Sequence, residues 1–457
     1  MNSWNAIIIN RPIQTLLLSF VAWKSLLLAI AVASPGLGYD TSTDLLLHGH
    51  GTRGHALLPS IFYRIVERLT RWDAIYFVKT ASRGYLYEQE WAFSWGYTRI
   101  IAFGASVLRQ AGLPCDLRLE ALLAICLAHV AHLFSVLVLF YLTRTVFPGP
   151  STRGLALTTA LLHIVSPAGI FLSAPYAESA CSFLSFLGYL LFSRSIAPQG
   201  RYSIHHDIFI LLSGLSFGLA TLCRSNGILN GILLLEEALS LILQLKHGLN
   251  ISVIRRGVAT GLGGIFVALG FLIPQYVAYQ AFCQNSNHQP LRPWCEKTLP
   301  SIYTFVQDYY WNCGFLRYWT ISNIPLFLLA APMIIIMGIS ITWAMQIKSN
   351  PPRGTSSHNK NKITATSPEQ MPGTSNTKNL VRSIAIPQLL LLLATLTNAH
   401  VQIITRLSSA YPVWLWYVAK KAASFSPKKP EATYLIRFMV MYAVVQGGLF
   451  SSFLPPA

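Results

Sequence analysis

The chain has 457 residues, of which 53% are hydrophobic and only 11% are charged. Soluble globular domains carry about 25% charged residues, so this composition excludes a soluble protein and favours one that crosses a membrane several times. The net charge of +18 would suggest a nucleic-acid partner in a soluble protein. In a membrane protein the positions of the basic residues matter more, and we expect no nucleic-acid partner.

Ten apolar runs of roughly 20 residues are long enough to cross a bilayer as helices, so we predict an all-α protein with one integral membrane domain, 1–457. The first run, Ile13 to Ala33, is too long for a cleaved leader and is interpreted as a retained span. Lys24 lies inside it, and we interpret this residue as snorkelling or packing against a partner. The other nine predicted spans are 119–143, 154–173, 176–193, 207–222, 227–245, 257–280, 324–346, 384–399 and 434–454.

Basic residues predict the orientation of these spans. With a cytoplasmic N-terminus, Arg and Lys gather in the cytoplasmic connections, whereas the short opposite turns hold little beyond Arg224 and Arg406. Residues 348–382 are basic, rich in Ser, Thr, Asn and Pro, and without periodicity, which predicts a disordered cytosolic linker. Lys420 and Lys421 break the pattern unless 411–419 dips into the membrane, and the sequence leaves that question open.

The seven cysteines include no CxxC pair and no metal-ligand spacing, so we expect no metal site and no cofactor. Cys283, Cys295 and Cys313 share the predicted non-cytoplasmic loop 281–323, where an oxidising compartment would allow a disulfide. The sequon at Asn250 falls in a predicted cytosolic loop and should be unused.

Polar residues gather in all five predicted non-cytoplasmic connections, which open on the same face. Each cluster alone is also compatible with interfacial anchoring or helix capping, but their one-sided distribution predicts a reaction site. The candidate residues are Trp72, Asp73, Tyr87, Glu88 and Glu90 in the long loop 34–118, Tyr176 and Glu178, Arg224 and Asn226, Trp311 and Arg317, and His400, Gln402 and Arg406.

Asp73 is the strongest candidate for a reacting group. In "RWDAIYFVKTASRGY" the apolar residues suit an amphipathic helix on the membrane surface, with Asp73 at its start beside Trp72. Burial and nearby cations can tune the pKa of a carboxyl in that position, although a simple helix N-cap is the alternative. Glu88 and Glu90, two apart in a predicted extended stretch, could share a metal, but no third ligand is apparent and a solvated loop face is the alternative.

A carboxylate at the membrane edge, arginines and many aromatic residues suit a lipid-linked, phosphate-bearing donor and a hydroxyl acceptor. Arginines offer forked donors to a phosphate and stabilise the charge that develops as it leaves. Asp73 would accept the proton of the attacking hydroxyl, giving direct displacement with inversion. Because a phosphate needs no strong acid to leave, one carboxylate can suffice, unlike in glycoside hydrolysis.

Five ordered stretches carry a resemblance to a known family. They are "RWDAIYF…GYLYE…AF", "SPAGIFLSAPYAES", "RSNGIL", "YYWNCGFLRYWTISNIPLFLLAAP" and "HVQIITRLSSAYP". In this order they resemble the second mannosyltransferase of GPI-anchor assembly, over residues 70 to about 417.

The resemblance implies a GT-C glycosyltransferase of the endoplasmic reticulum membrane, with about 10 transmembrane helices and amphipathic lumenal helices in the first long loop. It implies transfer of mannose from dolichyl phosphate mannose, in α-1,6 linkage, to the first mannose of a GPI precursor on the lumenal side. The family's Trp-Asp pair falls on Trp72 and Asp73, its Tyr-Glu pair on Tyr87 and Glu88, and its lumenal set on His400, Gln402 and Arg406. A small membrane partner subunit is also implied.

One departure and two competing functions accompany the resemblance. After Phe93 the stretch "SWGYTR" replaces an expected proline-bearing segment, which puts acceptor contacts there in doubt. A polytopic lipid or solute transporter without transferase activity would also be basic and rich in Gly and Pro, and the pair Glu236-Glu237 inside a predicted span is its best support. A non-catalytic scaffold of a glycosylation complex is the third hypothesis.

Overall fold

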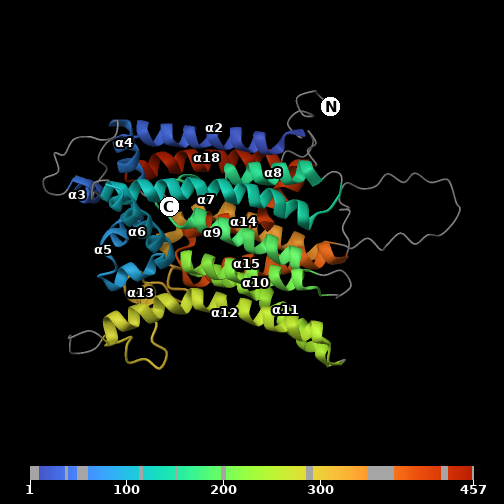
Figure 1. Ribbon diagram of the computed structural model, residues 1–457. Coiled ribbons are helices and arrows are strands. Elements are labelled where there is room, and N and C mark those ends of the chain that lie inside the picture. The colour runs from blue at the N-terminus through green and yellow to red at the C-terminus, as the bar shows by residue number, and fades with distance from the viewer. Residues whose placement is uncertain are drawn as a thin grey trace.

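The computed structural model describes residues 10–35, 40–48, 60–112, 117–149, 152–196, 202–246, 248–284, 292–347, 375–423 and 431–454, which form helices and turns and no strand. The long helices run side by side in one bundle, and short helices gather at one of its ends (Figure 1). We call this end the α5 end, after helix α5 (Ala74–Arg83). The all-α prediction is confirmed over these residues.

Eight helical segments in the described part of the chain are long and apolar enough to cross a membrane. Their termini agree with eight of the predicted spans to within several residues. They are α2 (Pro12–Ala33), α7 (Leu117–Val146), α10 (Ile204–Cys223), η4 with α11 (Ser225–Leu245), α12 with η5 (Ile251–Gln284), η6 with α14 (Ile321–Gln346), Thr377–Asn398 within α15 (Ser375–Asn398), and α18 (Glu431–Ser451).

The other two predicted spans have no counterpart among these eight segments. The run 154–173 is not one helix, because α8 (Thr152–Ile164) ends within it and a short turn, η2 (Gly169–Leu172), follows. Pro167 lacks a backbone N–H, and Gly169 has a left-handed φ of 41° at close contact with Ala443. The run 176–193 forms α9 (Glu178–Ser195), which packs between α7 and α10 at the centre of the bundle. Buried serines make α9 less apolar than its neighbours.

Residues 400–423 enter the interior of the bundle, which answers the question that 411–419 left open. The short elements η7 (Val401–Ile403), α16 (Ile404–Leu407), η8 (Ser408–Ala410) and α17 (Val413–Ala423) follow one another here. Arg406 lies at the α5 end beside Asp73, whereas the indole Nε1 of Trp416 donates to Thr143 Oγ1, near the opposite end of α7, at 2.9 Å. The segment therefore runs through the bundle, and α18 returns to the α5 end (Figure 1).

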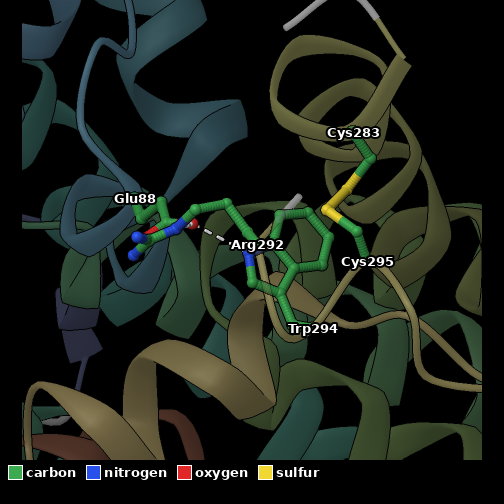
Figure 2. Close-up of a disulfide and its surroundings, with 5 residues drawn as sticks. All are labelled: Glu88, Cys283, Arg292, Trp294 and Cys295. Carbon is green, nitrogen blue, oxygen red and sulfur yellow. Dashed lines mark hydrogen bonds and ion pairs between the residues drawn. A yellow bond between two sulfur atoms is a disulfide. The ribbon is translucent and has the colours of Figure 1, made fainter. Parts of the chain in front are cut away.

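The cap at the α5 end is built from two connections. The first supplies α3 (Ser42–His48), α4 (Ser60–Leu69), α5, η1 (Glu88–Ala92) and α6 (Trp95–Gln110), and the second supplies α13 (Ile302–Tyr309). The cap has a small apolar core of its own, separate from that of the bundle, made by Trp91, Ala278, Trp294, Ile302 and Val306. A disulfide joins Cys283 to Cys295 beside this core (Figure 2).

Within the predicted disordered linker 348–382, residues 375–382 instead begin helix α15, since Lys378 to Arg382 continue the helical backbone into the apolar run. Residues 348–374 lie outside the described part of the chain.

Candidate active site

The strongest candidate, Asp73, stands immediately before α5. Its backbone is already helical and its carboxylate caps no N–H of the helix, so the capping alternative does not describe it. Trp72 has a left-handed φ of 57°, an uncommon conformation for a bulky residue that persists only when the surroundings hold it. Its ring packs on Phe453 after α18, with centroids 5.3 Å apart. The strained turn at Trp72 is thus fixed by the end of the chain.

Two acids and two arginines from four separate segments form a chain of alternating charge at this point. Arg406 Nη1 lies 3.0 Å from Asp73 Oδ2, and Arg406 Nε lies 3.8 Å from Glu178 Oε1. Arg224 Nη1 donates to the same Glu178 oxygen at 2.7 Å. The Glu178 side chain is only 1% exposed, whereas that of Asp73 is 33% exposed. The buried Glu178 therefore orients both arginines, and Asp73 remains accessible.

Aromatic rings hold Arg406 in place. Its guanidinium carbon lies 5.0 Å from the ring centre of Phe171 and 5.6 Å from that of Tyr176. The turn that carries Phe171 is fixed by Lys24 of α2, whose Nζ donates to the Leu172 carbonyl at 2.8 Å and to Ser173 Oγ at 2.7 Å. Lys24 therefore packs against its own chain.

A cavity of about 800 Å³ opens beside Asp73, within the range of about 300 to 1,000 Å³ that is typical of ligand pockets. Seven of the predicted site residues line it: Asp73, Arg224, Asn226, Trp311, Arg317, His400 and Arg406. The sequence prediction named residues from five connections, and the structure brings members of all five to this region.

The walls of the cavity differ in chemistry. One wall comes from the membrane helices α10, α12 and α15 and from η4, and it is mainly apolar, with Leu222, Leu229, Phe271 and Leu391. The facing wall comes from α13 and the loop that follows, with Tyr303, Trp311 and Arg317 among its residues. One side of the cavity thus suits a hydrocarbon chain and the other suits a sugar.

Seven predicted residues do not line the cavity: Trp72, Tyr87, Glu88, Glu90, Tyr176, Glu178 and Gln402. Tyr87 is exposed, and its ring lies 5.4 Å from the guanidinium of Arg83. Glu90 accepts from Arg83 at 2.5 Å and from the backbone N–H of Leu86 at 2.9 Å, so it stabilises its own turn. The predicted extended stretch here is instead the tight helical turn η1.

Glu88 is bound by partners from the second connection. Its Oε1 accepts from Arg292 Nε and from the indole Nε1 of Trp294, each at 2.8 Å (Figure 2). Its Oε2 accepts from Arg292 Nη2 and from the Tyr310 hydroxyl. Burial raises the pKa of Glu88, but the hydrogen bonds from Arg292 and Trp294 outweigh it and hold the pKa below its ordinary value. Sequence reasoning found Glu88 but missed its partners.

His400 and Gln402 support the loop after α13. Nε2 of His400 lies 2.9 Å from the Trp311 carbonyl, and its ring stacks on Tyr318 at 4.7 Å. Gln402 accepts from the Tyr318 hydroxyl at 3.0 Å. These residues therefore position the loop, and His400 also faces the cavity.

No group of three or more His, Cys, Asp or Glu side chains is placed to hold a metal ion among the described residues. Glu88 and Glu90 do not form a pair of ligands, because each is bonded to a different arginine. Glu237, one of the pair Glu236-Glu237 that best supported transport, lies 2.8 Å from the fully buried Arg256. It balances a buried charge, which is a structural role.

Comparison with protein families gives one match that covers nearly the whole chain. A family model described as "Mannosyltransferase (PIG-V)" matches residues 13–457. The chain belongs to the PIG-V mannosyltransferase family. It is therefore a glycosyltransferase, and the transporter alternative is not favoured.

Relatives of this PIG-V family chain extend over its full length. "GPI mannosyltransferase 2" of Gibberella zeae is 44% identical over 98% of this chain and 98% of the relative. The proteins of the same name from Aspergillus oryzae and Schizosaccharomyces pombe are 41% and 31% identical, over 98% and 96% of this chain and 96% and 84% of the relatives.

Among solved structures, the oligosaccharyltransferase of Archaeoglobus fulgidus is similar to the PIG-V family chain. The comparison with its structure that carries a tethered acceptor peptide gives a TM-score of 0.42 and 13% sequence identity, over 96% of this chain. This chain spans about half of that one, 55%.

Proposed function

We propose that this mannosyltransferase transfers the second mannose of the GPI anchor, in α-1,6 linkage, from dolichyl phosphate mannose to the first mannose of the precursor. The full-length relatives named GPI mannosyltransferase 2 support the acceptor and the place in the pathway. The cavity supports a lipid-linked donor, because an apolar wall of membrane helices meets two arginines at Asp73. This meeting of apolar wall, arginines and carboxylate is the observation that carries the proposal.

In the proposed reaction Asp73 is the general base. The acceptor hydroxyl oxygen forms a bond to C1 of mannose as the bond between C1 and the phosphate oxygen breaks, and the hydroxyl proton passes to Asp73. The configuration at C1 inverts, and dolichyl phosphate leaves with the bonding electrons. Arg406 Nη1 donates to Oδ2 of Asp73 at 3.0 Å, and the Asp73 side chain remains a third exposed and lines the cavity.

Arg406 and Arg224 supply positive charge where the phosphate would leave. Both are oriented by Glu178, so little reorganisation is needed when the charge develops. The mechanism assigns no role to a metal ion, and we expect transfer to continue when divalent ions are chelated.

We place the site on the lumenal side of the endoplasmic reticulum membrane. Two features support this side. The Cys283–Cys295 disulfide lies at the α5 end, and disulfides persist in oxidising compartments. The basic connections predicted to be cytoplasmic follow α7 and α14, whose C-terminal ends lie at the opposite end of the bundle from α5 (Figure 1). The resemblance adds a small membrane partner subunit, which co-purification would test.

Reconstitution of the purified protein in vesicles tests the activity. With dolichyl phosphate mannose and a precursor that carries one mannose, we expect a product with two mannoses. Asp73→Asn should lower the rate about 10²–10⁴-fold, the usual contribution of a general base, with unchanged folding. Asp40→Asn is the matched control, because Asp40 bonds Ser42 in its own turn at the same end.

Three outcomes would contradict the proposal. Near-normal transfer by Asp73→Asn would refute the base, and labelled-substrate uptake without a product would favour a transporter. Product formation only in the presence of another transferase would favour the scaffold.

A further inference from the structure

The facing wall of the cavity is formed by residues 292–319, which we call the outer wall. Eight of its residues line the cavity: Tyr303, Thr304, Gln307, Asp308, Trp311, Cys313, Gly314 and Arg317. Apart from α13, the stretch consists mostly of turns, so its own backbone hydrogen bonds hold only part of it. Its position must depend on contacts with the rest of the molecule.

The outer wall also contains backbone strain. Asn312 and Leu316 have left-handed φ values of 49° and 55°. Non-glycine residues keep such a conformation only where neighbouring structure determines it. On one side the wall is held by α15, where the Thr397 carbonyl accepts from the Leu316 N–H at 2.6 Å and the Leu396 carbonyl accepts from the Trp319 indole at 2.7 Å.

On the other side one carboxylate binds residues from two parts of the outer wall. Glu88 of η1 accepts hydrogen bonds from Arg292 and Trp294, at the start of the wall, and from Tyr310, directly after α13. These partners lie 204 to 222 residues away in sequence. The Glu88 side chain is 5% exposed, and Figure 2 shows it enclosed by Arg292 and Trp294. Both carboxylate oxygens of Glu88 are therefore bonded to donors of the protein itself.

The disulfide anchors the same corner covalently. Cys283 belongs to η5 (Gln280–Gln284), which continues α12, and Cys295 directly follows Trp294 (Figure 2). The turn 292–295 is therefore tied to the bundle through α12 and to η1 through Glu88. The indole of Trp294 fills the apolar core of the cap between these two links.

We propose that Glu88 is a positioning residue that fixes the outer wall, and through it the sugar-facing side of the cavity, without contacting substrate itself. This inference rests on the proposed function, because it assigns the outer wall to the glycolipid acceptor. The acceptor's sugars would lie against Tyr303 and Trp311, whose rings give platforms for them, with Arg317 at the same wall.

A thiol in the wall allows a test that does not depend on activity. Cys313 is a free, half-buried cysteine that lines the cavity. With Cys115, Cys126, Cys181 and Cys223 replaced by Ser, the rate at which a maleimide labels Cys313 in the purified full chain reports how firmly the wall is held. We expect Glu88→Gln and Arg292→Met each to raise this rate about tenfold, because charge-assisted hydrogen bonds to the carboxylate are lost.

A double-mutant cycle separates positioning from substrate contact. If Glu88 acts through Arg292, the double variant should label no faster than the more affected single variant, and the two effects on transfer should likewise not multiply. We expect KM for the acceptor glycolipid to rise several-fold, with a smaller change in KM for the donor. Arg292→Met also guards against misfolding, because the Arg292 side chain is 43% exposed.

Glu120→Gln is the matched control, since this buried carboxylate at the start of α7 pairs with Arg109 and lies outside η1. It should leave Cys313 labelling unchanged and should show no coupling to Arg292→Met. Unchanged labelling in both Glu88→Gln and Arg292→Met would overturn the inference, and so would independent, multiplying effects on transfer. Faster labelling of both variants, together with a wild type that transfers no mannose, would support the positioning role of Glu88 and refute the proposed function.

Discussion

Asp73 and Glu88 are two carboxylates of the same loop, each directly after an aromatic residue, in opposite environments. Asp73 is a third exposed, lines the cavity and has one arginine at 3.0 Å. Glu88 is nearly fully buried, lies away from the cavity lining and accepts from an arginine, an indole and a phenol. A carboxylate that must take up a proton needs an accessible oxygen, whereas one that holds structure is stabilised by saturating its oxygens.

The backbone around the two acids differs in the same sense. Trp72, before Asp73, is held in a left-handed conformation by its contact with Phe453. Tyr87, before Glu88, has an ordinary extended backbone. Backbone strain recurs at functional sites, and in this protein it lies beside the proposed base.

The largest effect on transfer should come from replacing Arg406, the partner of Asp73. Arg406→Met removes the partner of Asp73 and one of the two arginines on Glu178. We expect transfer to fall about 10²–10³-fold, as for loss of a preorganised donor. Single-turnover rates with bound donor would measure it, and Arg406→Lys should recover only part of the rate because lysine lacks the fork. A rate within a few-fold of wild type would remove Arg406 from the mechanism.

A smaller effect on the same environment should come from Lys24→Met. This change removes the hydrogen bonds to Leu172 and Ser173 that fix the turn under Arg406. We expect transfer to fall about tenfold, since a hydrogen bond from a charged group is worth about 1.5–3 kcal/mol. Ser25→Ala, at the exposed neighbouring position, should have no effect. Equal losses in both variants would mean that α2 matters only as a membrane helix.

Removal of the disulfide should loosen the part of the outer wall that Glu88 binds. The double variant Cys283→Ser, Cys295→Ser releases the turn 292–295 from α12 but leaves Glu88 in place. We expect labelling of Cys313 to rise several-fold, and less than in Arg292→Met, because the second link remains. Labelling above that of Arg292→Met would show that the disulfide, and not the carboxylate, is the main anchor.

The smallest expected effect is the pH dependence of the contact between Glu88 and the outer wall. Because the pKa of Glu88 is lowered in the folded protein, its stabilisation is fully present above the ordinary value of 4.5 and is lost as pH falls through the lower folded-state pKa. The ratio of Cys313 labelling rates, wild type over Arg292→Met, should stay constant from pH 7 to pH 5 and rise toward one below about pH 4.5. Dividing the rates cancels the ionisation of the thiol, and a rise already near pH 6 would contradict the assignment to Glu88.

Part of the fold could be predicted because membrane crossing depends on local composition. Runs such as Ile13 to Ala33 must form helices in lipid whatever their neighbours are, and eight predicted spans agree with the structure. The prediction of one span over 154–173 was wrong, because hydropathy averages over the Pro167 break. The passage of residues 400–423 through the bundle was left open and not counted as a span, because its short elements are buried in protein and carry serines and an arginine.

The sequence by itself determined the class of protein, the end of the bundle where polar residues collect and Asp73 as the foremost candidate, since each depends on residue type and short-range pattern. Only the tertiary structure decided which charges pair, because Asp73 and Arg406 are 333 residues apart and Glu88 and Arg292 are 204 apart. It alone separated an accessible carboxylate from a saturated one. Burial and donor number are properties of the packed chain, and no local pattern in the sequence encodes them.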